Sequence, residues 1–301
     1  MELRHPVING SGTFDAIAAR RAFGDRLLDE FPFSAFVSKT ITPEPRAGNP
    51  PPRLWETPSG LINSIGLPNK GLDGFLADDL PQLAELPVPL IVSVMGTSHD
   101  EFARLIDGVG GRDGFARLVG EVGSRDEVAA IELNVSCPNV ESGLIVGEQP
   151  GETLALLEVI RPLTEKPLIV KLTPNTGDPA AVARAAAEAG ADAVSLINTL
   201  RATGLDPVTR KPWLGATSGG LSGPAVRAVA LDQVRRVTAE VSVPVIGMGG
   251  IESGSDALDF LALGATAVAV GTANFRDPGA GLRVRRELEA LHGQAPALHL
   301  N

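Results

Sequence analysis

The stretch Ile131-Glu132-Leu133-Asn134-Val135-Ser136-Cys137-Pro138-Asn139 joins a short strand-like run to a polar turn stiffened by proline, and the same design recurs along the chain. The turn holds the only cysteine of the sequence, Cys137, with an asparagine on each side. Because enzymes place reacting groups on loops held by a rigid scaffold, the turn is a candidate functional site.

Eight apolar runs in the chain are short, rich in valine and isoleucine, and separated by helix-like segments. Continuous hydrophobicity of this kind predicts parallel strands buried on both faces. Eight strand–helix units in about 300 residues predict an α/β fold of the (β/α)8 TIM-barrel type, with a doubly wound open sheet as the alternative. No linker or repeat divides the chain, so residues 1–301 are expected to form one domain. The predicted strands are Val7–Ser11, Ala35–Thr40, Leu90–Met95, Ala130–Val135, Leu168–Leu172, Ala193–Ile197, Val243–Met248 and Ala267–Gly271, with helices at Asp178–Ala189, Pro224–Val241 and Ser253–Leu263.

Three connections that follow predicted strands are much longer than usual: Ile41–Leu72, Cys137–Gly151 and Asn198–Gly223. In a barrel the carboxyl ends of all strands lie on one face, which is where active sites of this fold are built. The long loops are therefore expected to meet over one pocket at that face, and the chain is expected to be an enzyme.

Composition excludes several classes of function. The 301 residues are 44% hydrophobic, enough for a large core, and the net charge of −10 argues against nucleic acid or an anionic membrane as a partner. One cysteine allows no internal disulfide and no cysteine-ligated zinc or iron–sulfur site, and the four histidines lack metal-ligand spacing, so no metal site is predicted. No apolar run reaches the roughly 18 residues of a membrane span, and no signal-peptide pattern opens the chain. A cytoplasmic location is expected.

Two glycine turns follow the last two predicted strands, at Gly247-Met248-Gly249-Gly250-Ile251 and Gly271-Thr272. Glycines here let backbone N–H groups approach an anion, with a helix N-terminus adding its positive end, and barrels commonly bind phosphate at this place. The alternative is that the glycines serve backbone shape alone. The first turn lacks the later glycine of a dinucleotide fingerprint, which favours a mononucleotide or a phosphorylated substrate.

Polar side chains gather at predicted strand ends. Lys39 and Lys171 lie on or beside apolar strands, where a lysine is costly unless a negative group pairs with it. That group is either a ligand or the partner in a structural salt bridge. Asparagine amides offer both donors and an acceptor, which suits a flat ligand with alternating carbonyl and N–H edges. Such amides are available at Asn63, Asn134, Asn139 and Asn198.

With these residues the sequence resembles the dihydroorotate dehydrogenase family, specifically the FMN-binding catalytic subunit of its class 1B type. The resemblance runs over nearly the whole chain and implies a (β/α)8 barrel that holds FMN. The motifs that carry it are Ser38-Lys39-Thr40, Asn63-Ser64-Ile65-Gly66-Leu67-Pro68-Asn69, Asn134-Val135-Ser136-Cys137-Pro138-Asn139, Val170-Lys171-Leu172-Thr173-Pro174-Asn175, Ile197-Asn198-Thr199-Leu200, Gly219-Gly220-Leu221-Ser222-Gly223-Pro224 and Gly247-Met248-Gly249-Gly250-Ile251.

The resemblance also implies a reaction. Cys137 would act as the general base that removes a proton from C5 of dihydroorotate, while a hydride leaves C6 for the flavin N5, giving orotate in the biosynthesis of UMP. A free thiol has a pKa of roughly 8.5, so a site that lowers it modestly would supply a thiolate near neutral pH. A cationic Lys171 beside the flavin would stabilise its reduced anionic form.

The family's contacts fall on named positions of this sequence. Those toward the substrate would be Lys39, Asn63, Ser64, Ile65, Gly66, Leu67, Asn134, Asn139, Asn198 and Thr199. Those toward FMN would be Ser11, Lys39, Thr40, Asn134, Lys171, Ile197, Gly223, Gly249, Gly250, Gly271 and Thr272.

Because it has Cys137 at the position of the base, the chain resembles class 1 enzymes, since class 2 enzymes use a serine base. Class 1A enzymes share the cysteine and use fumarate, whereas the segment Asn198–Pro224 resembles class 1B. Class 1B implies a partner subunit that carries FAD and a [2Fe–2S] cluster and passes electrons to NAD, in a homodimer or heterotetramer. Ser93 departs from the family, which commonly has asparagine there.

Other functions remain open from the residues. A dihydropyrimidine dehydrogenase-like flavin subunit would act on uracil or thymine, although Lys39 near Asn63 favours a ligand that bears a carboxylate. The glycine turns alone would allow a flavin-free barrel that binds a phosphorylated metabolite as an isomerase or lyase. In a non-catalytic binding subunit the lone cysteine in its loop would be accidental.

Overall fold

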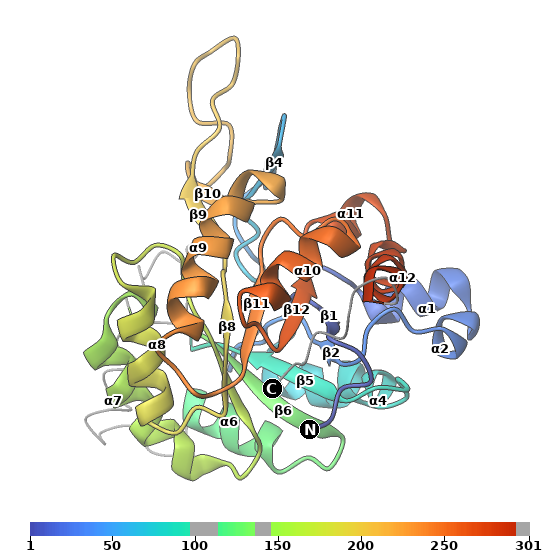
Figure 1. Ribbon diagram of the computed structural model, residues 1–301, viewed down its shortest axis with the longest axis vertical. Coiled ribbons are helices and arrows are strands. Elements are labelled where there is room, and N and C mark those ends of the chain that lie inside the picture. Colours follow the sequence, from blue (N-terminus) through green and yellow to red (C-terminus); the bar gives the residue numbers. More distant parts are fainter. Residues whose placement is uncertain (97–113, 136–145, 293–301) are drawn as a thin grey trace.

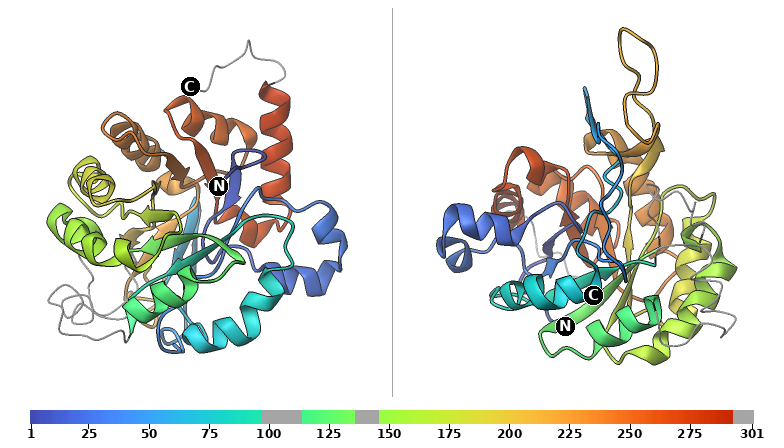
Figure 2. Two further views of the ribbon diagram at one scale, coloured as in Figure 1. Left: turned by 90° about the horizontal axis from the view of Figure 1, so that it is seen from below. Right: turned by 180° about the vertical axis from the view of Figure 1, so that it is seen from behind.

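Eight parallel strands form one sheet that curls into a barrel, as predicted (Figures 1 and 2). The computed structural model describes residues 1–96, 114–135 and 146–292. Each predicted strand is present, with some ends trimmed by a few residues. In sheet order the strands are β1 (Val7–Asn9), β12 (Ala267–Val270), β11 (Val245–Met248), β8 (Ala193–Leu196), β7 (Leu168–Lys171), β6 (Val128–Asn134), β5 (Leu90–Val94) and β2 (Phe36–Val37).

A side chain closes the barrel between its first and last strands. β1 and β2 lie side by side without forming a ladder, and the fully buried Asn9 bridges them. Its Nδ2 donates to the Val37 carbonyl and its Oδ1 accepts from the Val37 N–H, both at 2.8 Å. The amide of Asn9 thus stands in for a peptide group of a neighbouring strand.

The helices pack around the outside of the barrel (Figure 2). Two of them show why they begin where they do: Asp178 caps α8, and Ser253 and Asp256 form a capping box at α10. Among the described residues, no helix combines the length and apolar character that a membrane crossing requires. The helices are α1 (Ala16–Phe23), α2 (Arg26–Asp29), α3 (Gly71–Gly74), η1 (Phe75–Asp79), α4 (Leu80–Leu83), α6 (Phe115–Gly123), η2 (Val146–Glu148), α7 (Pro150–Ile160), η3 (Arg161–Leu163), α8 (Pro179–Glu188), η4 (Pro224–Val226), α9 (Arg227–Thr238), α10 (Gly254–Ala262), α11 (Ala273–Arg276) and α12 (Ala280–His292).

The apolar core has two parts, because barrel strands are buried on both faces. A smaller cluster from alternate strand positions, including Ile8, Val37, Ile91 and Ile169, fills the lower barrel interior. A larger cluster lies between the strands and the helices. The barrel is therefore a packed core, and a ligand has room only at its ends.

The sequence suggested that the first and third long connections are loops throughout, but both contain strands. They form a second, antiparallel sheet in the order β3 (Leu54–Thr57), β4 (Gly60–Asn63), β10 (Gly219–Ser222), β9 (Leu200–Ala202). These strands are only three or four residues long, β3 alternates in exposure and β10 begins with a Gly-Gly pair, so their sequence gives little strand signal. The pairing of β4 with β10 brings the two connections together, as expected. Much of the second long connection, Cys137–Gly151, lies outside the described residues.

Between β9 and β10 the chain rises as a long arm above the barrel (Figure 1). Near its base the ring of Trp213 meets that of Trp55 on β3, with centroids 5.3 Å apart. Gly204 lies against Trp55, where a Cβ would come within 2.6 Å of the ring. The arm is thus attached to the small sheet by aromatic packing.

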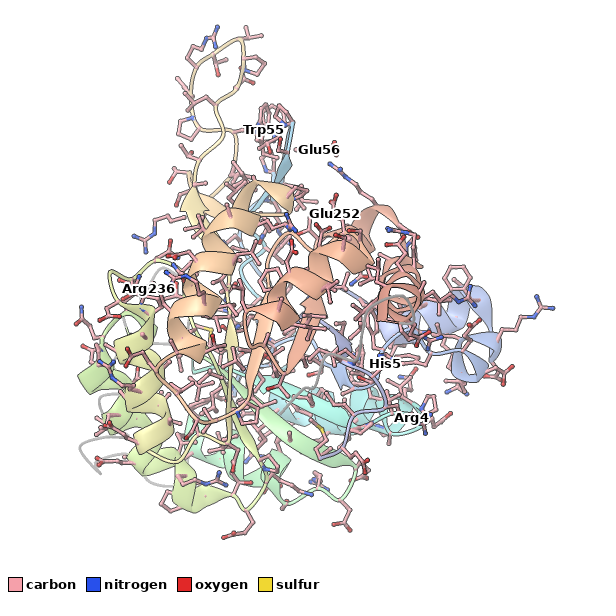
Figure 3. All side chains as sticks on the ribbon, viewed as in Figure 1. Arg4, His5, Trp55, Glu56, Arg236 and Glu252 are labelled. Carbon is pink, nitrogen blue, oxygen red and sulfur yellow. The ribbon has the colours of Figure 1, made fainter. Side chains whose placement is uncertain are left out.

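His5 makes stability depend on pH. It precedes β1 (Figure 3), and its Nδ1 accepts a hydrogen bond from the Val7 N–H at 3.3 Å. Burial, followed by the charges of Arg285 and Arg4, lowers the pKa of His5 from 6.5 to about 4. Between these values the unfolded chain binds the extra proton. The stabilisation is therefore complete above pH 6.5 and is lost as the pH falls toward 4.

We expect the free energy of unfolding to fall between pH 7 and pH 5 by about 1 kcal/mol more in the natural protein than in His5→Asn, after allowing for partial solvent screening. Asparagine keeps an acceptor near the Nδ1 position but does not titrate in this range. Urea unfolding at the two pH values measures the difference. Equal pH dependence in both proteins would remove His5 as the cause.

Candidate active site

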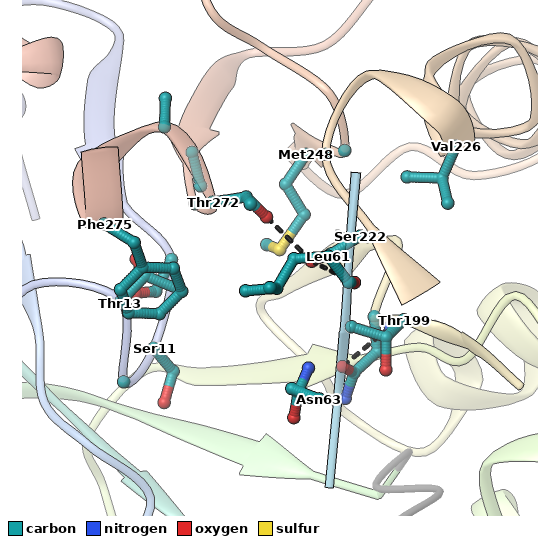
Figure 4. A pocket seen from close by; sticks show the side chains of 18 of the residues that line it. Ser11, Thr13, Leu61, Asn63, Thr199, Ser222, Val226, Met248, Thr272 and Phe275 are labelled. Atoms are coloured by element: carbon teal, nitrogen blue, oxygen red, sulfur yellow. Dashed lines mark hydrogen bonds between the residues drawn. The ribbon is translucent and has the colours of Figure 1, made fainter. Parts of the chain in front are cut away.

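A cavity of about 550 Å³ opens at the carboxyl ends of the barrel strands, beneath the small antiparallel sheet (Figure 4). This volume is typical of a small-molecule or cofactor site. The sequence-predicted residues that line it are Ser11, Lys39, Thr40, Asn63, Ile65, Gly66, Leu67, Asn134, Lys171, Ile197, Asn198, Thr199, Gly223, Gly249, Gly250, Gly271 and Thr272.

Three other predicted residues are placed differently. Ser64 is fully buried beside the cavity, where its hydroxyl accepts a hydrogen bond from the Asn49 amide at 3.0 Å. It is not among the residues that line the cavity. Cys137 and Asn139 lie outside the described residues, directly after strand β6 and Val135.

Strand β6 builds the floor of the cavity. Side chains two positions apart share one face of a strand, so Glu132 and Asn134 both point into the barrel above Ala130. The Glu132 carboxylate is only 3% exposed, and it accepts hydrogen bonds from Ser93 Oγ at 3.1 Å and Ser195 Oγ at 3.2 Å. Its Oε1 lies 3.9 Å from Lys171 Nζ. A buried carboxylate thus pairs with the lysine that lines the cavity.

Hydroxyl groups connect this carboxylate to the cavity wall. Thr40 Oγ1 lies 2.9 Å from Ser93 Oγ and 3.1 Å from Ser11 Oγ. It also accepts from Asn134 Nδ2 at 3.1 Å. The floor is therefore one continuous hydrogen-bonded layer, which fixes the orientation of its amides and hydroxyls.

The opposite wall presents further polar groups. The Asn198 amide donates to Asn134 Oδ1 at 3.3 Å and accepts from the Thr199 N–H at 2.8 Å. Asn63 on β4 donates to the Gly220 carbonyl at 3.2 Å, across the junction of the two long connections. A Cβ at Gly220 would collide with the Thr199 hydroxyl, so glycine is needed for this close approach.

Lys39 faces the open cavity from the end of β2. The surrounding protein desolvates its amine and, as the main effect, lowers its pKa from the usual 10.5, while Asp15 and Asp79 oppose that shift and Arg53 adds to it. A negatively charged group of a ligand would restore the stabilisation that Lys39 loses on desolvation. Lys171 and Arg276 also line the cavity, and Arg276 is paired with Glu56.

The glycine turns form the other end of the cavity. Gly249 has φ of +127°, and a Cβ there would approach the Ala230 Cβ to 2.8 Å. Gly271 differs, because the nearest atom to a Cβ would be Thr13 Cγ2 at 3.8 Å. Its open side belongs to the cavity, so the backbone of this turn can approach a ligand closely.

Two N–H groups in the first turn of α10 are not available to an anion at this end. Asp256 N–H donates to Ser253 Oγ, and Gly254 N–H donates to Glu287 Oε2 at 2.7 Å. An anion would be held by the backbone of the glycine turns, since the Thr272 hydroxyl already donates to Ser222 Oγ at 2.8 Å.

The chain was compared with known proteins. A family model described as dihydroorotate dehydrogenase matches residues 1–291. The chain belongs to the dihydroorotate dehydrogenase family. It is therefore an oxidoreductase, as the resemblance in sequence had implied.

Similar members of the dihydroorotate dehydrogenase family carry more specific names. The chain is 47% identical over 296 residues to the "Dihydroorotate dehydrogenase B (NAD(+)), catalytic subunit" of Desulforudis audaxviator, covering 96% of this chain and 89% of the relative. It is 45% identical to the protein of the same name from Geobacter sp. strain M21, with coverages of 96% and 90%. A crystal structure of DHODH from Eimeria tenella, in complex with ferulenol, superposes with a TM-score of 0.75 at 25% identity, over 98% of this chain and 83% of that one.

The acidic residue of the floor, Glu132, was not among the predicted site residues. Glu132 lies two residues before Asn134 on a predicted apolar strand, and the argument that singled out the two lysines applies equally to a carboxylate there. Ser195 was missed because a lone serine in a strand carries no signal. Of the two explanations for Lys171, the structure contains the salt bridge, and the same amine also borders the cavity. Within the described ranges, no three histidine, cysteine, aspartate or glutamate side chains gather as a metal site requires.

The two glycines offer a matched test of ligand binding. Gly271→Ala should fold normally, because its methyl group meets only ordinary contacts, yet it should weaken cofactor binding by tenfold or more because the methyl group enters the cavity. Gly249→Ala should instead lower the melting temperature, since its φ is strained for alanine and its methyl group meets Ala230. Flavin titration of the apoprotein and thermal unfolding separate the two effects. Unchanged flavin affinity in Gly271→Ala would show that this turn does not contact the cofactor.

Proposed function

We propose that this chain oxidises dihydroorotate to orotate in the biosynthesis of pyrimidines, with FMN bound in the cavity. The observation that carries the proposal is the convergence of Lys39, Asn134, Lys171 and Asn198 on one cavity that also contains two glycine turns. A flat, polar, anionic substrate and a phosphorylated cofactor match the two ends of that site. The names of the similar proteins support the same reaction.

The residues present fit FMN. The open side of Gly271, together with Gly249, Gly250 and Thr272, suits a phosphate, and the polar floor suits the edge of a flavin ring. When bound, FMN supplies the acceptor for the hydride from C6 of the substrate. The remaining FMN contacts are proposed at Ser11, Lys39, Thr40, Asn134, Lys171, Ile197 and Gly223.

The protein groups would orient the substrate and remove its proton. Lys39 suits the carboxylate of dihydroorotate, and Asn63, Asn134 and Asn198 suit the carbonyl and N–H groups of the ring. Cys137 is proposed as the base that takes the proton from C5. Asn139 and the turn Asn63–Leu67 would complete the contacts, with Thr199 beside them.

We further propose that electrons leave through a partner subunit that carries FAD and a [2Fe–2S] cluster and reduces NAD. The words "catalytic subunit" and "NAD(+)" in the names of the relatives support such a partner. The chain's single cysteine could not hold a cysteine-ligated cluster alone. The expected assembly is a homodimer or a heterotetramer, and the expected location is the cytoplasm.

Absorbance spectroscopy tests this function. The purified protein should be yellow with bound FMN and should lose the flavin absorbance when dihydroorotate is added without oxygen. Orotate should compete with the substrate, whereas uracil should not, because it lacks the carboxylate for Lys39. A colourless protein that takes up no FMN, or bleaching by dihydrouracil alone, would contradict the proposal. Rapid reoxidation of the isolated chain by fumarate would show that fumarate, and not NAD, is the electron acceptor.

A further inference from the structure

A polar layer lies inside the barrel where packed apolar side chains are usual. Its centre is the Glu132 carboxylate, which is 3% exposed and is not among the residues that line the cavity. Ser93 on β5 and Ser195 on β8 each donate to one of its oxygens. A buried carboxylate is costly to desolvate and is easily replaced in a core by apolar residues, so its presence beneath the site needs a reason.

The layer is directly below the cavity and above the apolar interior. On each of its three strands the residue two positions earlier belongs to or packs against the apolar cluster: Ile91, Ala130 and Ala193. Two positions later come Asn134 at the end of β6 and Ile197 just after β8, and both line the cavity. Glu132 thus lies one layer below the residues that line the cavity. From there its charge can act on a ligand without direct contact.

The hydrogen bonds of the layer run in one direction. The hydroxyl hydrogen of Ser93 is used by Glu132, and that of Ser11 is used by the Ser38 carbonyl at 2.9 Å. Ser93 Oγ must therefore accept from Thr40, whose single hydroxyl hydrogen serves this contact at 2.9 Å, while Thr40 Oγ1 itself accepts from Asn134 Nδ2. The chain of donors ends on the carboxylate, so the charge of Glu132 fixes which way the floor is oriented.

We propose that Glu132 is a positioning residue that sets the charge beneath the cofactor, by partly neutralising Lys171 and by anchoring the hydrogen bonds that reach Asn134. This inference rests on the proposed function, since it assumes that a flavin occupies the cavity. Lys171 is one of the cations that line the site, and its Nζ lies 3.9 Å from Glu132 Oε1. Removing the negative charge leaves the positive charge uncompensated, which favours the reduced, more anionic flavin.

The test is the midpoint potential of bound FMN in the natural protein and in Glu132→Gln, measured by spectroelectrochemical titration. The variant should prefer reduced over oxidised flavin about tenfold more strongly, which raises the two-electron potential by about 30 mV. Glu132→Asp, which keeps the charge but withdraws it from Lys171, should shift the potential less and in the same direction. Glu240→Gln, which changes the net charge equally in an exposed ion pair with Arg184, should leave the potential unchanged.

Each outcome decides the proposal. An unchanged or lowered potential in Glu132→Gln overturns it. If this variant takes up no FMN, the potential of Glu132→Asp is judged by the same criterion, and failure of both to bind FMN would make Glu132 a folding residue instead. A natural protein without bound flavin would defeat the proposed function itself, whereas equal potentials in yellow proteins would defeat only the role of Glu132.

Discussion

Replacing Cys137 by alanine should lower the rate of flavin reduction by dihydroorotate by about two to four orders of magnitude at neutral pH, the range that a positioned general base contributes. Bound FMN should be unaffected, because the proposed flavin contacts lie on other residues. Anaerobic stopped-flow absorbance measures the rate, and the visible spectrum measures the bound flavin. Reduction at the natural rate would remove Cys137 from its proposed role.

The single cysteine makes an independent test possible without mutation. An alkylating reagent that reacts with thiols can modify only Cys137 in this chain. Modification should therefore inactivate the natural protein in proportion to the label incorporated, and orotate should protect it. In Cys137→Ala the same treatment should change nothing. Full activity after complete labelling would contradict a catalytic thiol.

The second large effect is expected on stability. Lys171→Met should lower the free energy of unfolding by about 3 kcal/mol, the low end of the cost of breaking a buried ion pair, because it leaves the Glu132 carboxylate buried without its cation. The low end applies since the two groups are 3.9 Å apart and two hydroxyls still bind the carboxylate. Urea unfolding of the apoprotein measures the change.

Two further variants isolate the cause. Lys211→Met removes an exposed lysine of the arm and should change stability by less than about 0.5 kcal/mol. The double variant with Lys171→Met and Glu132→Gln removes both charges of the buried pair and should recover most of the loss. A double variant as unstable as Lys171→Met would mean that the lysine acts by packing and not by charge.

The barrel could be predicted because its strands carry their own signal. Runs such as Leu168–Lys171 and Ala267–Val270 are buried on both faces, and such strands read as continuous apolar segments. The small sheet could not be predicted. β4 and β10 are far apart in sequence, and their pairing depends on glycines that allow close approach, which is a property of the folded chain.

Most of the candidate site could be located from residue type at strand ends, because parallel strands bring their carboxyl ends together. The buried layer could not. The serines Ser93 and Ser195 become meaningful only once the barrel places both beside Glu132. The hydrogen bond that Glu287 of α12 accepts from the Gly254 N–H at the start of α10 was equally unpredictable, since the two residues are far apart in sequence.

The Asn9 amide, which bridges the first and last strands of the barrel, should deamidate at a rate that depends on whether the chain is folded. Asn9 is followed by Gly10, and asparagine before glycine is prone to deamidation because no side chain hinders attack by the next backbone nitrogen. In the folded protein both ends of the Asn9 amide are bound to Val37, which restrains that reaction. A chain that stays unfolded would acquire a carboxylate there, facing the Val37 carbonyl without a donor. Time spent unfolded would thus convert Asn9 to an acid and weaken the junction of β1 with β2, where this amide makes two of the hydrogen bonds.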